Sequence, residues 1–146
     1  MLEIPLVRLH DDIEVPAHAR PGDAGVDLRA ATDVVLPAGG GRAVVPTGLR
    51  MAIPEGHAGF VQPRSGLARD HGVTCLNTPG LIDAGYRGEL QVLLVNTDPT
   101  TAYTVHRGDR IAQLVISAVD TEVEWHEVDA LDETTRDAFG FGSTGR

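Results

Sequence analysis

The sequence predicts an all-β sandwich or barrel with very little helix. Seventeen glycines and nine prolines interrupt the chain at short intervals, and the segments between them are rich in Val, Ile, Leu and Thr. Short segments of this composition between turn residues are typical of strands, and many such strands in one chain favour a sandwich or barrel. Eight runs stand out, at residues 3–9, 42–53, 59–62, 73–76, 89–96, 102–106, 110–118 and 121–128.

Two of these runs differ in their burial pattern. In residues 121–128, Val123 and Trp125 alternate with acidic residues and a histidine. This period-two pattern is typical of a strand with one solvent-exposed face. Residues 93–95 are uniformly apolar, which predicts a strand that is buried on both sides. The sheets should therefore contain both kinds of strand.

Two segments are candidates for helices. Residues 65–71 form the better one, with Ser65 as its N-cap, and residues 129–137 are weaker because they hold few large apolar side chains. From Arg136 onward the chain reads RDAFGFGSTGR, a composition too flexible to hold structure without a partner. A chain of 146 residues has the usual size of one domain. We therefore expect a single domain over residues 1–146 that ends in a flexible tail.

Charge and cysteine content exclude several classes of function. The net charge of −9 repels the phosphate backbone and anionic lipids, so we expect no nucleic-acid and no membrane partner. All basic residues are arginine, which suits phosphate recognition but is equally the result of a codon bias. Cys75 is the only cysteine, so no intrachain disulfide can form. With no apolar run of membrane-spanning length, we expect a cytoplasmic protein.

The segment GLIDAGYRGEL, at residues 80–90, predicts a hairpin tip that carries a carboxylate and an aromatic ring. A carboxylate held there can accept a proton from water and direct the resulting nucleophile. Taken alone, Asp83 is more often a residue that closes its own turn. Tyr86 offers a flat ring for a sugar, although tyrosines at this spacing also serve as simple packing residues.

Two further segments are candidates for phosphate binding. PRSGLA, at residues 63–68, places Arg64 and Gly66 before a possible helix start, where backbone N–H groups collect anions. GDRIAQLV, at residues 108–115, places Arg110 and Gln113 where a strand begins after a turn. The alternatives are an ordinary capped loop for the first segment and a solvated turn for the second.

AGVDLRA, at residues 24–30, embeds a charge among small and apolar residues. Partial burial makes Asp27 costly unless a cation or a donor compensates it. A hydrated magnesium ion is one possibility, and Arg29 or a neighbouring arginine is the other. In the tail, Arg136 and the sequence FGSTG combine a guanidinium, an aromatic ring, hydroxyls and glycine amides that suit a nucleoside triphosphate. A disordered terminus is the alternative there.

These five segments resemble, in the same order, the five motifs of the trimeric dUTP diphosphatase (dUTPase) family. The resemblance implies a jelly-roll-like β subunit that forms a homotrimer with three shared active sites. Residues 129–146 would be a C-terminal arm that closes the site of a neighbouring subunit. The implied activity is the Mg²⁺-dependent hydrolysis of dUTP to dUMP and pyrophosphate. This reaction keeps uracil out of DNA and supplies dUMP for dTTP synthesis.

The resemblance also implies roles for individual residues. Asp83 would activate the water that attacks the α-phosphorus, and Asp27 would hold a water molecule on the Mg²⁺ bound by the triphosphate. Asn77 would pair with the uracil edge, and Tyr86 would pack beneath the deoxyribose and exclude a ribose 2′-hydroxyl. The other expected substrate-binding residues are Arg64, Ser65, Gly66, Gly80, Arg110, Gln113, Arg136, Phe141, Gly142 and Ser143.

One position departs from the family pattern. The resemblance implies that Phe141 covers the uracil when the tail closes, but Phe139 stands where the family commonly has a small residue and is the alternative.

Three alternative functions remain to be weighed against hydrolysis. The dCTP deaminases resemble this chain in the hairpin, but they use a glutamate near the position of Leu93, and leucine cannot transfer a proton. A nucleotide-binding module without turnover is a second alternative. A structural jelly roll is the third, and it leaves the arginines beside the glycine loops unexplained.

Overall fold

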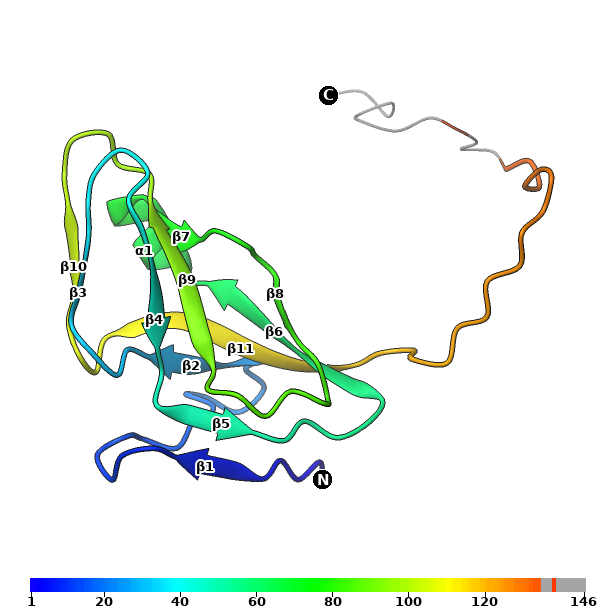
Figure 1. Cartoon of the computed structure of the whole chain (residues 1–146), viewed down its shortest axis with the longest axis horizontal. Coiled ribbons are helices and arrows are strands. Elements are labelled where there is room, and N and C mark those ends of the chain that lie inside the picture. The colour runs from blue at the N-terminus through cyan, green and yellow to red at the C-terminus, as the bar shows by residue number, and fades with distance from the viewer. Residues whose placement is uncertain (135–137, 139–146) are drawn as a thin grey trace.

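The computed structural model describes residues 1–134 and 138, and this part of the chain folds almost entirely into short strands (Figure 1). Its one helix is α1 (Ser65–His71). The prediction of an all-β chain with very little helix is confirmed. The strands are β1 (Leu6–Arg8), β2 (Gly25–Arg29), β3 (Val34–Leu36), β4 (Arg42–Pro46), β5 (Leu49–Met51), β6 (His57–Pro63), β7 (Val73–Cys75), β8 (Gly80–Ile82), β9 (Gln91–Asn96), β10 (Tyr103–Val105) and β11 (Arg110–Ala118).

Every strand pairing is antiparallel, and the strands form four sheets. The largest sheet has the order β2-β11-β6-β8, so it joins segments from the beginning, the middle and the end of the chain. A second sheet has the order β4-β9-β7, and β1-β5 and β10-β3 form two-stranded sheets. The central strand β11 pairs with β2 on one side and with β6 on the other. Residues from three distant segments therefore become neighbours.

The core lies between these sheets and consists of aliphatic side chains. The largest fully buried ones include Leu28, Leu36, Leu90, Leu94 and Ile111. Burying a leucine side chain contributes about 1.5–3 kcal/mol to stability. The core is therefore the main source of the fold's stability, and it fixes the strands that carry the polar residues described below.

The expected run 42–53 is two strands and not one. The chain turns at Gly48, which has a φ of 71° that side-chain-bearing residues rarely adopt. β4 then belongs to the sheet of β9, whereas β5 pairs with β1. The sequence pattern also missed β2, β3 and β8. β2 and β8 contain glycine or aspartate, which have little β-propensity, and β3 is only three residues long.

The end of the described chain differs from the sequence prediction. Residues 121–128 form no strand, and residues 129–134 form no helix. After β11 the chain runs away from the body of the molecule (Figure 1). The alternating side chains are present, but Trp125 is 90% exposed because no second strand lies beside it. Residues 135–137, the rest of the helix candidate 129–137, lie outside the described residues.

The predicted helix at residues 65–71 is confirmed in its bounds but not in its cap. Arg64 occupies the N-cap position with extended backbone angles, and no side chain caps the helix. The helix ends at Gly72 in the left-handed conformation, and the Gly72 N–H bonds to the Ala68 carbonyl. In the described part of the chain, no helix is long and apolar enough to cross a membrane.

Candidate active site

Asp27 lies between two arginines from different parts of the chain. Its side chain is 23% exposed, and the Arg110 Nη1 atom lies 3.3 Å from its Oδ2 atom. The Arg64 Nε atom lies 3.9 Å from Oδ1. A partly buried carboxylate needs such compensation. Arg29, the first candidate partner, instead contacts Glu14 at 3.2 Å and the Gly108 carbonyl at 2.8 Å. We call Asp27, Arg64 and Arg110 the arginine cluster.

Strand pairing explains why these residues meet. Gln113 on β11 is paired with Asp27 on β2 and with Gln62 on β6, so all three lie in one row across the sheet. Arg64 directly follows β6, and its Nη1 atom donates to the Arg110 carbonyl at 2.7 Å. A register shift follows Arg110 at the start of β11. The structure therefore brings together four residues that the sequence analysis assigned to phosphate or metal binding.

The space around this row is open on both sides of Asp27. One cavity of about 300 Å³ is lined by Asp27, Gln62 and Gln113, together with Gly25 and Asp23. Another, of about 260 Å³, is lined by Asp27, Arg29, Arg110 and residues 13–19. The amides at the start of α1 have no side-chain cap, and a Cβ placed at Gly66 would meet no atom within 4 Å. This open, donor-rich surface is suited to an anion.

Asp83 lies at an exposed hairpin tip directly after β8. The Tyr86 N–H donates to the Asp83 carbonyl at 3.0 Å, which closes the turn. The Tyr86 hydroxyl donates to the Glu89 carbonyl at 2.9 Å and so fixes the ring. A Cβ at Gly88 would lie 2.3 Å from that hydroxyl, so only glycine fits beneath the ring. The carboxylate of Asp83 is left free of the turn's own hydrogen bonds, since the carbonyl closes the turn.

This hairpin lines a third cavity, of about 300 Å³, which we call the hairpin cavity. Its polar lining residues are Asn77, Asp83, Tyr86, Glu89 and Gln91, and its apolar ones are Val44, Leu81, Ile82 and Leu93. A Cβ at Gly80 would lie only 3.2 Å from the Asn77 Nδ2 atom, so glycine permits this close approach. The three residues expected to contact a nucleoside and activate water therefore line one cavity.

The hairpin cavity and the arginine cluster lie apart on the same chain. Ile82, next to Asp83, pairs with Gly59 on β6, whereas Arg64 lies five residues further along the chain, directly after β6. At about 3.3 Å per residue, this separation is roughly 16 Å along the sheet. Among the described residues, the hairpin cavity also shares no lining residue with either of the two cavities beside Asp27. The two groups of one chain do not form a single compact site.

Glu89 is a residue that the sequence analysis missed. Its Oε1 atom accepts a hydrogen bond of 2.8 Å from the Gly48 N–H, and its carbonyl accepts the bond from Tyr86. It thus connects the Gly48 turn to the hairpin. No pattern of charge or spacing pointed to this contact, because Gly48 is far from Glu89 in the sequence. The expected contacts of Arg136, Phe139, Phe141, Gly142 and Ser143 lie outside the described residues.

Comparisons with known proteins agree on one family. The family model described as dUTPase matches residues 11–145. A deoxyuridine 5′-triphosphate nucleotidohydrolase of Thermobifida fusca is 54% identical over 144 residues, which cover 99% of this chain and 79% of that protein. A protein of the same name from Rhodococcus erythropolis is 52% identical over 144 residues, which cover 99% of this chain and 87% of that protein.

Solved structures agree with the sequence comparison. The dUTPase of Staphylococcus bacteriophage 80alpha with dUpNHpp has a TM-score of 0.86 and 28% identity, over 99% of both chains. A mutant dUTPase from phage phi11 of S. aureus has a TM-score of 0.77 and 27% identity, over 88% of this chain and 97% of that one. The latter structure is described as revealing the coordination of a structural Mg(II) ion.

Proposed function

The chain belongs to the dUTPase family and hydrolyses dUTP, and from this premise we propose a site that is shared between two copies of the chain. The products are dUMP and pyrophosphate, formed when water attacks the α-phosphorus. The observation that carries the proposal is the separation of the hairpin cavity from the arginine cluster. One copy provides the base and the nucleoside pocket, and a neighbouring copy provides the phosphate-binding arginines.

Asp83 is the base in this proposal. It is exposed at the tip of a closed turn, in the same cavity as Asn77 and Tyr86. A nucleoside bound between these two residues would place its α-phosphate beside the carboxylate. Asp83 accepts a proton from water as the oxygen attacks phosphorus, and pyrophosphate leaves from the opposite side.

The arginine cluster binds the phosphate chain in this proposal. Arg64 and Arg110 carry charges that suit phosphate oxygens, and both lie within 4 Å of the Asp27 carboxylate. Substrate phosphates would replace Asp27 as the partner of at least one arginine. Ser65, Gly66 and Gln113 would donate further hydrogen bonds from the start of α1 and from β11. Positioning and charge neutralisation then provide most of the rate acceleration.

Asp27 is the residue that would hold Mg²⁺, through a water molecule. Within the described residues, no three His, Cys, Asp or Glu side chains are grouped so that they could hold a metal ion. A single carboxylate fits Mg²⁺, because this ion keeps several waters and takes the remaining ligands from phosphates. When bound, the ion would neutralise charge on the triphosphate and fix its conformation.

The lining of the hairpin cavity supports hydrolysis of a uracil nucleotide over deamination. Asn77 offers both a donor and an acceptor to the base, and Tyr86 presents a flat ring for the sugar. Leu93 lines the same cavity at the position where the deaminase reaction would need an acid–base residue. A leucine cannot transfer a proton, so dCTP deamination is disfavoured.

A homotrimer is the assembly that we propose. The exposed, apolar side chains of Trp125 and Leu131, which are 90% and 85% accessible, support the docking of this segment on another copy. Residues 129–146 would then be the arm that closes a neighbouring site. Arg136 would reach the terminal phosphate, Phe141 or Phe139 would cover the uracil, and Gly142 and Ser143 would complete the contacts.

The biological role follows from the reaction. Removal of dUTP keeps uracil out of DNA, and the product dUMP is a precursor for dTTP synthesis. A cytoplasmic location agrees with this role and stays a prediction.

The test measures release of pyrophosphate from dUTP, dCTP and UTP with Mg²⁺, and release of ammonia from dCTP, before and after Asp83→Asn. We expect pyrophosphate from dUTP alone, and little of it from the variant. Ammonia from dCTP would support the deaminase. Nucleotide binding without release of either product would support a binding module and contradict the proposal.

A further inference from the structure

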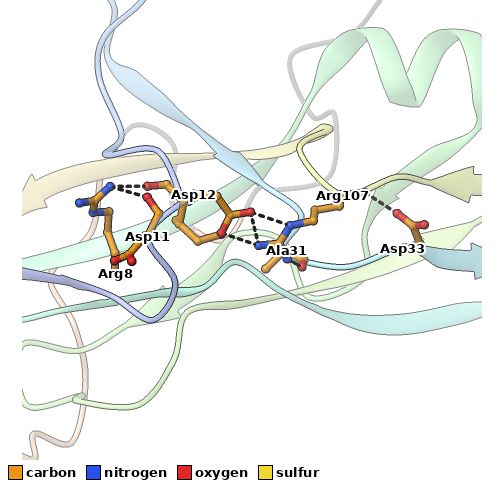
Figure 2. A network of polar contacts seen from close by, with 7 residues as sticks. Arg8, Asp11, Asp12, Ala31, Asp33 and Arg107 are labelled. Carbon is orange, nitrogen blue, oxygen red and sulfur yellow. Dashed lines mark hydrogen bonds and ion pairs between the residues drawn. The ribbon is translucent and has the colours of Figure 1, made fainter.

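Arg107 makes more polar contacts than any other side chain of its turn, and none of the five motifs includes it. Its Nε and Nη2 atoms donate to Asp12 at 2.6 to 3.0 Å, and its Nη1 atom donates to the Ala31 carbonyl. Its backbone N–H donates to the Asp33 carboxylate at 2.6 Å. Figure 2 shows these contacts in one line, with Arg107 between Asp12 and Asp33.

The turn that Arg107 belongs to leads directly into the arginine cluster. Residues 106–109 form a turn in which the His106 N–H donates to the Asp109 carboxylate at 2.8 Å. The Gly108 N–H and the Asp109 carbonyl both bond to Ala30, at 2.8 and 2.9 Å. β11 then begins at Arg110. A shift of this turn would therefore move the Arg110 side chain and also the carbonyl to which Arg64 donates.

The partners of Arg107 belong to two separate segments. Ala31 and Asp33 follow β2, the strand of Asp27, so these contacts tie the turn to the strand that carries the carboxylate. Asp12 lies in the N-terminal loop, which Arg8 holds from the other side by donating to the Asp11 and Ile13 carbonyls (Figure 2). Residues 13–19 of this loop wall the cavity beside Asp27 and Arg110. Arg107 thus connects three segments around the arginine cluster, which are its own turn, the residues after β2 and the N-terminal loop.

The Arg107–Asp12 pair has the geometry that distinguishes a useful surface ion pair. Most exposed ion pairs contribute little to stability, but bidentate arginine–carboxylate pairs within a network are the exception. Here both Asp12 carboxylate oxygens accept hydrogen bonds from Arg107, and the Ala31 carbonyl accepts one more. The hydrogen bonds from Arg107 hold the pKa of the Asp12 carboxyl below its usual value, so the pair is ionised at neutral pH.

We propose that Arg107 is a positioning residue for the triphosphate. It fixes the turn that precedes Arg110, and so it sets the position of the Arg110 side chain. It also sets the position of the Arg110 carbonyl, which accepts a hydrogen bond from Arg64. The proposal rests on the proposed function of the arginine cluster. Arg107 itself touches no phosphate. Its effect should therefore appear in binding of the β- and γ-phosphates and should be absent from binding of the nucleoside, which belongs to the hairpin cavity.

The test compares the dissociation constants of dUpNHpp and dUMP, measured by calorimetry with Mg²⁺ on the full chain. Arg107→Ala should weaken dUpNHpp by about tenfold and dUMP by less than about twofold, since a small displacement of phosphate-binding groups has a large effect. Arg107→Lys should weaken dUpNHpp binding by less than Arg107→Ala does, because lysine keeps the charge but not the forked geometry of the guanidinium. Asp12→Asn should have a smaller effect of about two- to threefold, since the Ala31 and Asp33 contacts remain.

Two controls separate this role from general loosening. Arg69→Ala breaks an equally short, two-pronged pair with Asp70 on α1 and should leave both dissociation constants unchanged. Arg8→Ala loosens the N-terminal loop but keeps the contacts of Arg107 with Ala31 and Asp33, so it should weaken dUpNHpp binding by no more than Asp12→Asn does. In steady-state assays, Arg107→Ala should raise the KM for dUTP with kcat within about twofold.

Equal weakening of dUpNHpp and dUMP in Arg107→Ala, or no weakening of either, would overturn the proposal. If Arg107→Ala does not fold, the ratio of the two constants in Arg107→Lys decides the question by the same criterion. Failure of the proposed function looks different, because the unaltered protein would then release no pyrophosphate from dUTP. The proposal on Arg107 alone fails when the unaltered protein hydrolyses dUTP and the Arg107 variants bind dUpNHpp as tightly as the unaltered protein does.

Discussion

The polar residues of the hairpin cavity come from one stretch of chain between Asn77 and Gln91, whereas the arginine cluster joins residues 83 positions apart. The hairpin is held by its own turn, through the contacts of Tyr86 with Asp83 and Glu89. The cluster is held by the pairing of β11 with β2 and β6. A local site tolerates changes elsewhere in the fold, whereas a site assembled across a sheet depends on every strand that contributes to it.

The largest expected effect concerns the base of the hairpin cavity. Asp83→Asn should lower kcat by roughly a hundredfold or more and leave dUTP binding largely intact, because the amide cannot accept the proton from water. Stopped-time assays of pyrophosphate release and calorimetry with dUpNHpp would measure the two quantities. Asp70→Asn, on the exposed side of α1, is a suitable control. Unchanged turnover would contradict the assignment of Asp83 as the base.

A second experiment tests whether the two regions act across a subunit boundary. Asp83→Asn and Arg64→Ala should each be nearly inactive alone, but a co-expressed mixture should regain about a quarter of the normal rate. In a random assembly, about a quarter of the shared sites combine an intact hairpin with an intact Arg64 from another copy. The rate of the mixture is measured against each variant alone. A mixture no more active than its components would mean that each site lies within one chain.

A third, smaller effect concerns the metal. Asp27→Asn should raise the Mg²⁺ concentration for half-maximal rate by roughly tenfold, because a residue that orients a metal-bound water commonly changes metal affinity by this amount. A titration of the rate with Mg²⁺ measures it. The hairpin variant Asp83→Asn, titrated in the same way, should keep the normal midpoint despite its low rate. If the Mg²⁺ concentration for half-maximal rate is unchanged in Asp27→Asn, Asp27 does not bind the metal and only orients Arg64 and Arg110.

The smallest effect should come from the tyrosine hydroxyl. Tyr86→Phe removes the hydrogen bond to the Glu89 carbonyl and should lower the free energy of unfolding by up to about 1 kcal/mol, since water can replace the lost donor. Denaturant unfolding monitored by circular dichroism would measure this change. Turnover of dUTP should stay within about twofold. A tenfold loss of turnover would show that the hydroxyl contacts substrate.

The periodic part of the sequence predicted the long strands well. The bounds of β11 and α1 were predicted correctly, because runs of β-branched residues and Gly-bounded ends are local signals. Gly48 and the strands β2, β3 and β8 were not predicted, because their conformation depends on partners elsewhere in the chain. The alternating segment 121–128 is the opposite case. It has the sequence pattern of a strand, but it forms none because no neighbouring strand pairs with it.

The sequence by itself determined the class of fold, the family and the residue types of the site, because these are carried by local composition and by five short ordered motifs. Only the tertiary structure decided which residues meet. It paired Asp27 with Arg64 and Arg110 instead of Arg29, and it placed these residues away from Asp83. The physical reason is that strand register and sheet order set these distances, and both result from packing of the whole core.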